Sequence, residues 1–325
     1  MTFKANWENT ATHYRLPAHL IRKMIRSAYP NQRIQAFEIM PAGCANLNIR
    51  FSLQEDAKTH ILRIYLRDQN AAYRERKIAE LLDRTLPVPK TGYIGEVDSY
   101  RFAVTEYIPG ISLSEHLLKH KPHNRQFDIM TEAGEMLAKL REFQFSESGF
   151  FDQALNIIIP LNRKAHIHFI QECLRDKNVI SQLAAPARLQ IKRYFDCHAT
   201  LLPDKDSQQL VHGDFDPANI LVNKVNGQWK ISGILDWEFA FSGSILCDVA
   251  NMLRYAHQMP SDFTNAFLKG LDNGGVILPK NWQIRINMLN LLSLLDCLKR
   301  TDPCKRPNQY QDICQLIDNI LSGEL

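Results

Sequence analysis

The chain has 325 residues, of which 45% are hydrophobic and 23% charged, with a formal net charge of +4. This composition is typical of a globular protein with a large core, and the length allows one large domain or two lobes. The slight positive excess falls short of the concentrated basic footprint of a nucleic-acid binder, so no nucleic-acid partner is expected. The seven cysteines are scattered without a CxxC pair, which argues against a disulfide framework or a zinc site.

No targeting or membrane segment is predicted. The first residues, "MTFKANWENTATHYRLP", lack the apolar core of a signal peptide, and no unbroken apolar stretch is long enough to cross a membrane. We therefore expect a cytoplasmic protein with no membrane span, and secretion by a route without such a signal stays open.

The first hundred residues predict one helix followed by a β-rich region. Apolar residues at helical spacing favour an amphipathic helix over 17–29. A second helix is expected over 70–84, halted before "LPVPK". Short β-rich runs surround this second helix, at residues 33–40, 47–53, 59–66 and 99–108.

After Gly110 the pattern becomes mostly helical, with one exception. Apolar stripes predict helices over 127–143, 186–195 and 282–298. The exception is a pair of strands that flank Asn226-Gly227, a strong hairpin signal. The layout is of the α+β class, a small β-rich lobe connected to a larger, mainly α-helical lobe. We expect three parts: an N-terminal helical extension (1–30), an N-lobe (31–108) and a C-lobe (109–325).

The segment "VHGDFDPANILV", residues 211–222, places two carboxylates and an amide beside apolar strand edges. Unpaired buried charge is costly, so such a cluster needs a partner or a function. Because a hairpin folds back on itself, its far end returns near its start. Asp214, Asn219 and Asp236 are thereby expected to meet. A base, an amide oxygen and a carboxylate suit a site for Mg²⁺ and a nucleotide, since magnesium takes few protein carboxylates and completes its shell with phosphates and water.

These residues resemble the "HGDxxxxN…D" signature of the aminoglycoside phosphotransferase and choline kinase-like family, whose members have a protein-kinase-like two-lobed fold. The segment "GILDWEFAFSGSILCDVANMLR" extends the resemblance. The resemblance implies that Asp214 is catalytic and that Asn219 and Asp236 bind Mg²⁺. It further implies that Asp248 holds the backbone of the catalytic loop, a structural role.

The N-lobe offers the nucleotide site that the resemblance implies. Strand alternation puts Ile61 and Arg63 on one face, so that Ile61 lines the adenine pocket and Arg63 reaches the α- and β-phosphates. A Glu75 ion pair would orient Arg63, which replaces the lysine of many relatives with a bidentate fork. Taken singly, Arg63 and Glu75 would be interpreted as solvated surface charges. The implied nucleotide-binding residues are Gly43, Asn46, Ile61, Arg63, Glu75, the Glu106 carbonyl and the Ile108 N–H.

A small-molecule hydroxyl is the expected acceptor. Asp216 stands where protein kinases of the HRDxKxxN type have a lysine, and no APE motif follows Asp236. Asp216 either contacts the acceptor or stays solvated, and Glu238 is a weaker candidate for a water-mediated metal contact. The acceptor pocket is expected around residues 151–169 and 253–310, where mixed charges give no support for a strongly cationic acceptor.

Two further points complete the expectations from sequence. His166 and His168 have no third ligand nearby in the sequence, so a metal site there is not expected. The leading hypothesis is an O-phosphotransferase that uses Mg²⁺ and ATP, with GTP also open, to phosphorylate an aminoglycoside-like, choline-like or other metabolite. The alternatives are a pseudokinase without transfer activity, favoured only by Arg63 and the single glycine Gly43, and an enzyme that transfers AMP to a protein.

Overall fold

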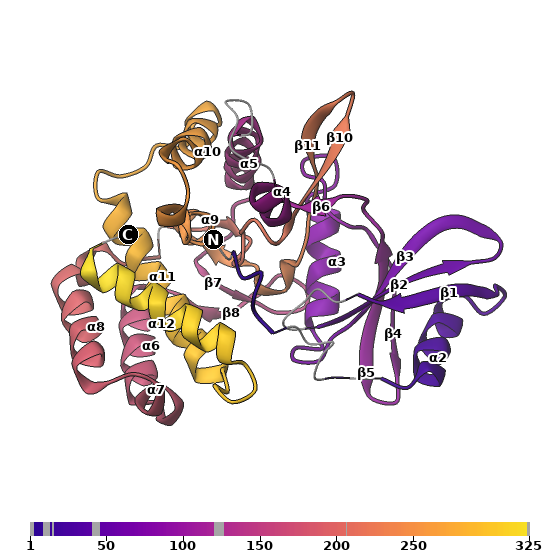
Figure 1. Ribbon diagram of the computed structural model, residues 1–325, viewed down its shortest axis with the longest axis horizontal. Coiled ribbons are helices and arrows are strands. Elements are labelled where there is room, and N and C mark those ends of the chain that lie inside the picture. The colour runs from indigo at the N-terminus through magenta and orange to yellow at the C-terminus, as the bar shows by residue number, and fades with distance from the viewer. Residues whose placement is uncertain are drawn as a thin grey trace.

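Alternating apolar residues build a five-stranded antiparallel sheet in the computed structural model, which describes residues 3–8, 14, 16–40, 46–119, 127–205 and 207–323. This sheet forms the right-hand lobe in Figure 1, and most of the helices form the left-hand lobe. The predicted two-lobed α+β layout is therefore confirmed. In spatial order, the strands are β1 (Ile34–Ile39), β2 (Leu47–Leu53), β3 (Asp56–Ile64), β5 (Tyr100–Glu106) and β4 (Thr91–Val97).

Two helices pack against this sheet. Helix α2 (Ala18–Ala28) buries Leu20, Ile21, Met24 and Ile25 in the same apolar cluster as the inner residues of β2, β3 and β5. The predicted helix over 17–29 is thus present and belongs to the N-lobe core. Helix α3 (Ala71–Leu81) lies between the sheet and the helical lobe (Figure 1).

The predicted hairpin is present and carries a third strand. Strands β10 (Ile220–Val225) and β11 (Gln228–Ile234) pair antiparallel, and β6 (Ile111–Ser112) joins the free edge of β10. The turn uses Asn226 and Gly227 at φ 52° and 80°, the left-handed conformation that this residue pair favours. The β6 pairing connects the segment after Gly110 directly to the hairpin.

A second small sheet, which the sequence did not predict, positions the two loops of the site. Its strands, in spatial order, are β8 (Ile157–Pro160), β7 (Gly149–Phe151), β12 (Phe241–Gly243) and β9 (Gln209–Val211). The loop 212–219 runs from β9 to β10, and the segment 235–240 runs from β11 to β12. Because β9 pairs with β12 and β10 pairs with β11, the two segments are held side by side.

The larger lobe is built around helix α11, whose middle residues are almost all buried. The predicted helices over 127–143, 186–195 and 282–298 correspond to α5, α8 and α11. The α-helices after the connector are α4 (Leu113–Lys119), α5 (Asp128–Lys139), α6 (Arg163–Arg175), α7 (Lys177–Gln182), α8 (Ala185–His198), α9 (Leu246–Leu253), α10 (Ser261–Asn273), α11 (Trp282–Arg300) and α12 (Pro307–Ser322).

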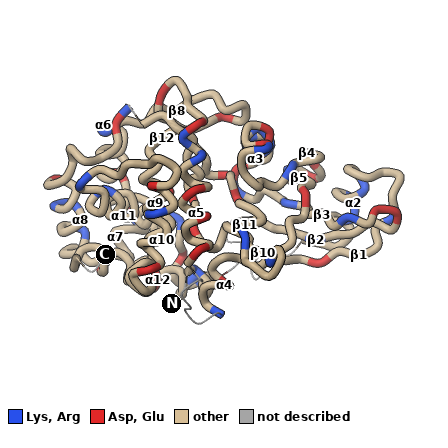
Figure 2. The backbone as a smooth tube through the Cα atoms, turned by 90° about the horizontal axis from the view of Figure 1, so that it is seen from above, with Lys and Arg blue, Asp and Glu red and all other residues tan. Residues whose placement is uncertain are grey.

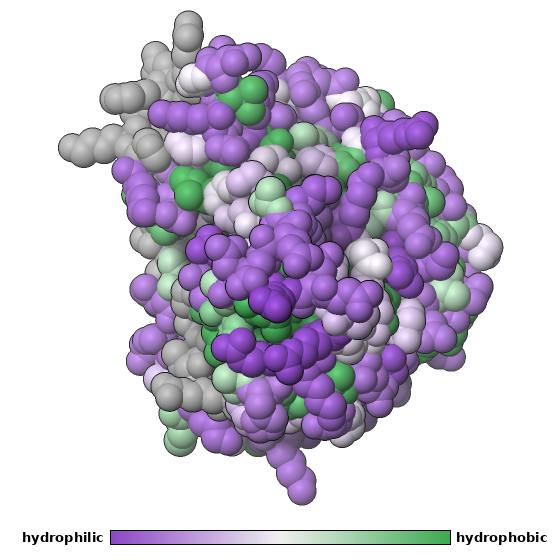
Figure 3. Space-filling model, turned by 90° about the vertical axis from the view of Figure 1, so that its right-hand side faces the viewer, coloured by the Kyte–Doolittle hydropathy of each residue, from purple (hydrophilic) through white to green (hydrophobic). Residues whose placement is uncertain are grey.

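The surface carries both acidic and basic residues, and the N-lobe end of the molecule has no extended apolar area. Acidic and basic residues are both scattered over the two lobes (Figure 2). The N-lobe end of the molecule is mainly hydrophilic, with hydrophobic residues in small separate groups (Figure 3). Within the described ranges, no helix combines the length and the apolar character that a membrane crossing requires.

Candidate active site

The loop between β9 and β10 is shaped by His212 and Gly213. The His212 ring donates from Nε2 to the Leu235 carbonyl (2.8 Å) and accepts at Nδ1 from the Asp214 N–H (3.2 Å). Gly213 has φ 85°, and a Cβ atom there would lie 2.3 Å from the Phe239 carbonyl oxygen. Only glycine therefore fits this turn, which presents Asp214 to the space between the lobes.

Asp248, from the first turn of α9, fixes the backbone of the same loop. Its two carboxylate oxygens accept the N–H groups of His212 (2.8 Å) and Gly213 (2.9 Å). Complete burial raises the pKa of Asp248 to about 7, although the hydrogen bonds from these backbone N–H groups lower it. The expected structural role of Asp248 is confirmed by these contacts.

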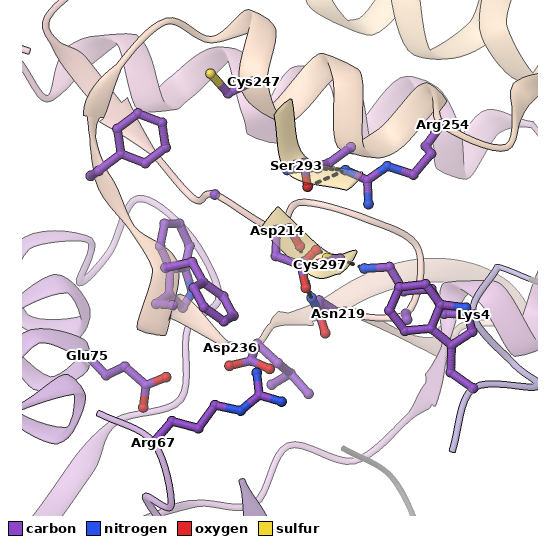
Figure 4. A pocket seen from close by; sticks show the side chains of 18 of the residues that line it. Lys4, Arg67, Glu75, Asp214, Asn219, Asp236, Cys247, Arg254, Ser293 and Cys297 are labelled. Atoms are coloured by element: carbon purple, nitrogen blue, oxygen red, sulfur yellow. Dashed lines mark hydrogen bonds and ion pairs between the residues drawn. The ribbon is translucent and has the colours of Figure 1, made fainter. Parts of the chain in front are cut away.

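Asp214, Asn219 and Asp236 come together as the hairpin argument predicted. The Asn219 side-chain amide donates to both the carbonyl and the carboxylate of Asp214, each at 2.9 Å. The Leu235 N–H donates to the Asn219 carbonyl (2.8 Å), which brings the next residue, Asp236, to the same place. Asp236 has φ 67°, an uncommon conformation for a residue other than glycine. All three side chains line one cavity of about 1190 Å³ (Figure 4).

Arg63 on β3 lies among three carboxylates. Its Nη2 contacts Glu75 (3.2 Å), Asp236 at short range, and Glu238 more distantly (3.8 Å). The expected Arg63–Glu75 ion pair is therefore present, and the Tyr65 hydroxyl also donates to Glu75. Burial raises the pKa of Glu75 despite the nearby guanidinium. Arg63 thus joins the N-lobe to the segment that carries Asp236.

Glu238 contributes a buried acid that the sequence argument weighted low. Its carboxylate accepts from the Asn46 side chain (2.9 Å), and its carbonyl accepts two N–H groups of Arg74 on α3 (2.7 and 3.2 Å). Burial, with help from the charge of Asp236, raises the pKa of Glu238 to about 7. Asn46 thus lies beside the acidic cluster, whereas Gly43 lies outside the described residues.

The residues expected around adenine lie along the connector side of the cavity. Ile61, Glu106 and Ile108 all line it. The Glu106 N–H already donates to the Lys90 carbonyl (2.9 Å), so it is not available to a ligand. Among the described residues, no main-chain acceptor is found for the Ile108 N–H. The adenine contacts themselves stay a prediction.

Lys4 is a residue of the site that sequence reasoning missed. Its ammonium group lies 2.8 Å from Asp214 and contacts Asp216 at shorter range. Burial alone would raise the pKa of Asp214, but the charge of Lys4 lowers it to about 2. Burial alone would lower the pKa of Lys4, but the two carboxylates raise it. No spacing or motif connects position 4 to the loop, so nothing in the sequence indicated this contact.

The surroundings of Lys4 hold the N-terminal segment against the larger lobe. Phe3 is buried and packs on the rings of Tyr255 and Phe263. The Trp7 indole donates to Asp312 at 2.7 Å. These contacts seat the segment 3–8 against the C-lobe, with Lys4 directed at the catalytic loop (Figure 4).

Asp216 is buried, with 3% of its surface exposed, so the alternative of a solvated side chain is wrong, and the alternative of a contact with the acceptor stays a prediction. One of its oxygens accepts the Ala218 N–H (2.7 Å), and the other contacts Lys4. The position that holds a lysine in protein kinases here holds a carboxylate, and a lysine from the N-terminal segment is paired with it.

The cavity extends into the regions predicted for the acceptor. Its lining includes several residues between positions 159 and 172 and between positions 289 and 309, as well as residues of the N-terminal segment. His166 hydrogen-bonds to the carbonyl of Asn162, the N-cap of α6 (2.8 Å), and His168 lies near Glu172. In the described part of the chain, no cluster of three or more His, Cys, Asp and Glu residues could hold a metal.

Known proteins share both the sequence pattern and the fold. Residues 37–282 match the model of the phosphotransferase enzyme family. A search of curated proteins found no significant match.

Solved structures of the same fold are distant in sequence. One is the aminoglycoside phosphotransferase APH(4)-Ia (TM-score 0.73, 16% identity, covering 94% of this chain and 99% of the other). Spectinomycin phosphotransferase APH(9)-Ia, in complex with ADP and spectinomycin, aligns with TM-score 0.62 and 12% identity over 96% of this chain and 99% of the other. Choline kinase LicA from Streptococcus pneumoniae aligns with TM-score 0.60 and 13% identity over 92% and 99%. The family match covers well over half of the sequence, and the chain therefore belongs to the phosphotransferase enzyme family.

Proposed function

We propose that this protein transfers the γ-phosphoryl group of ATP to a hydroxyl group of a small molecule in the cytoplasm. The observation that carries the proposal is the meeting of Asp214, Asn219 and Asp236, from two separate loops, at one cavity between the lobes. Phosphoryl transfer depends mainly on positioning and on charge neutralisation, and this arrangement supports both. The neighbouring structure solved with ADP is consistent with a nucleotide co-substrate.

Asn219 and Asp236 are the residues that would hold Mg²⁺. The Asn219 amide nitrogen is engaged by Asp214, which leaves its side-chain oxygen available as a ligand. Glu238 Oε1 and Arg63 Nε are buried without a hydrogen-bond partner among the described residues, as expected where a hydrated ion and phosphates would bind. Mg²⁺ would supply charge neutralisation on the β- and γ-phosphate oxygens.

Asp214 is proposed to orient the acceptor hydroxyl and to accept its proton. As the acceptor oxygen bonds to the γ-phosphorus, the bond from that phosphorus to the β,γ-bridging oxygen breaks and ADP leaves. The low pKa of Asp214 keeps it ionised at neutral pH, so it is ready to accept a hydrogen bond. Arg63, held by Glu75, would contact the α- and β-phosphates.

The test is turnover with Mg·ATP and a broad panel of hydroxyl compounds, read by intact mass for a gain of one phosphate. We expect Asp214→Asn to lower kcat by roughly 10²- to 10⁴-fold, the range that general base catalysis supplies. The matched control is Asp196→Asn, an exposed aspartate paired with Lys192 on α8. An unaffected Asp214→Asn enzyme would contradict the proposal. A product whose mass increases by AMP instead of phosphate would show that the enzyme transfers AMP.

A further inference from the structure

Arg254 follows the last residue of α9 and is buried, with 3% of its surface exposed, yet its side chain lines the large cavity. Figure 4 shows it on the same side of Asp214 as Lys4. Its charge acts on both of these groups, opposing protonation of Lys4 and lowering the pKa of Asp214 against the effect of burial. Arg254 therefore lies close to the place where the acceptor hydroxyl would be bound.

The hydrogen-bond partners of Arg254 are neutral. Its Nε donates to the Asn290 side-chain oxygen (3.0 Å), and its Nη2 donates to the oxygens of Asn251 (2.6 Å) and Ser293 (3.1 Å). Among the described residues, no carboxylate forms an ion pair with this guanidinium. A buried cation usually has an anionic partner, because the desolvation of an unpaired charge is expensive.

One end of the guanidinium is left for a ligand. No hydrogen bond from Nη1 is found within the described ranges, and Nη1 is not among the fully buried unbonded atoms. Because the other two nitrogens are fixed by α9 and α11, the orientation of Nη1 toward the cavity is set in advance. A guanidinium held in this way suits a carboxylate or a phosphate, to which Nη1 can donate a charge-assisted hydrogen bond.

The nearby carboxylates are already paired. Lys4 contacts both Asp214 and Asp216, so a cationic acceptor would have to displace an ammonium group and approach Arg254. An anionic acceptor would instead be attracted by the positive charges of Lys4 and Arg254. Arg300, which also lines the cavity, differs because its guanidinium is paired with Asp296 within α11.

We propose, on the basis of the proposed function, that the acceptor carries an anionic group in addition to its hydroxyl, and that Arg254 binds this group. The anionic group is a carboxylate or a phosphate ester. Arg254 is then a specificity-determining residue, and Asn251, Asn290 and Ser293 hold its guanidinium in position.

The experiment compares matched acceptors at saturating Mg·ATP. One arm pairs hydroxy acids with their amides, a second pairs sugar phosphates with the free sugars, and a third contains amino alcohols and aminoglycosides. We expect turnover with the anionic member of a pair in the first or second arm, which also identifies the anion. Arg254→Gln should raise the KM for that acceptor by about 10- to 100-fold, with the KM for ATP unchanged. The KM of Arg254→Lys should lie between those of Arg254→Gln and the wild type. Arg193→Gln, at an exposed position of α8 that does not line the cavity, is the matched control.

A second measurement uses the unmodified protein, in case Arg254→Gln does not fold. Acetate or inorganic phosphate, whichever matches the anion of the acceptor, should compete with the acceptor and not with ATP. Equal turnover of neutral or cationic acceptors, with Arg254→Gln unaffected, would overturn the inference and leave the proposed function intact. If Mg·ATP binds but no acceptor of any class is phosphorylated, the proposed function fails and the inference fails with it.

Discussion

Single residues of the site divide into those that a spacing reveals and those that it cannot reveal. Asp214 and Asn219 lie five positions apart on one loop, and the hairpin signal at Asn226-Gly227 indicated that Asp236 would return to them. Lys4 meets Asp214 across 210 positions, a contact that depends on how the N-terminal segment is seated. Arg254 was also missed, because its significance rests on the neutral character of its partners, which only the fold defines.

The arginine at position 63 is the departure from the usual lysine that the sequence left unexplained. One guanidinium nitrogen, Nη2, makes the contacts to Glu75, Asp236 and Glu238, while Nε stays without a hydrogen-bond partner among the described residues. In the structure, Arg63 holds together three acids that would otherwise repel one another. The same group would have to share Asp236 with the magnesium ion when a nucleotide binds.

Replacement of Arg63 tests its part in nucleotide binding. We expect Arg63→Met to lower kcat/KM for ATP by about 10- to 100-fold, since a charge-assisted hydrogen bond is worth roughly 1.5–3 kcal/mol. Arg63→Lys should retain part of this activity. Steady-state kinetics at varied ATP concentration gives the measurement, and Lys58→Met, at an exposed position of the same strand, is the control. Wild-type ATP kinetics in Arg63→Met would show that the residue has no role with the phosphates.

Among the elements, long amphipathic segments were predictable and short strands were not. The helices α2 and α11 follow clear apolar periodicity, and β2 coincides with its predicted run. Strand β4 was missed because Gly92 and Gly95 interrupt its pattern, and its turn into β5 uses Asp98 and Ser99 with positive φ in place of a glycine pair. The small second sheet has strands of three and four residues, too short to show a period.

The catalytic loop is an element whose stability should depend on pH through His212. Burial is the main cause that lowers the pKa of His212 below its usual 6.5, with Lys4 acting in the same direction and Asp214, the Leu235 carbonyl and Asp236 opposing. The folded protein keeps this ring neutral, whereas the unfolded chain takes up a proton below pH 6.5. His212 therefore lowers the free energy of unfolding as the pH falls below 6.5, by at most about 1.4 kcal/mol per pH unit.

Denaturant unfolding between pH 7.5 and about 5 tests this contribution. We expect the wild type to lose stability over this range more steeply than His212→Gln, because the variant has no ring to protonate. His168→Gln serves as the control, since His168 lies exposed on α6. Parallel pH dependences for wild type and His212→Gln would show that the loop is not coupled to this ring.

On the scale of the whole molecule, the described residues among the first 28 contact both lobes. Residues 3–8 lie against the helical lobe, with Phe3 among Tyr255 and Phe263, whereas α2 belongs to the core of the β-sheet lobe (Figure 1). Two described parts of the N-terminal region therefore belong to different lobes, and Lys4, Ala5 and Trp7 of the first part line the cavity. The two-lobed layout could be predicted from the sequence, but the position of residues 3–8 could not, because no periodicity or motif links this segment to the helical lobe.

Replacement of Lys4 by methionine tests how the contact between the N-terminal segment and the catalytic loop affects catalysis. Loss of the ammonium group leaves two buried carboxylates without their cation, so the pKa of Asp214 should rise from about 2. The acid limb of the pH–rate profile is expected to move to higher pH, and the free energy of unfolding near neutral pH to fall by about 3–5 kcal/mol. Lys23→Met is the matched control, because Lys23 pairs with Asp98 at a similar distance (2.7 Å) on an exposed surface where such pairs contribute little. If Lys4→Met and Lys23→Met both keep the wild-type acid limb, the N-terminal lysine does not set the ionisation of the catalytic aspartate.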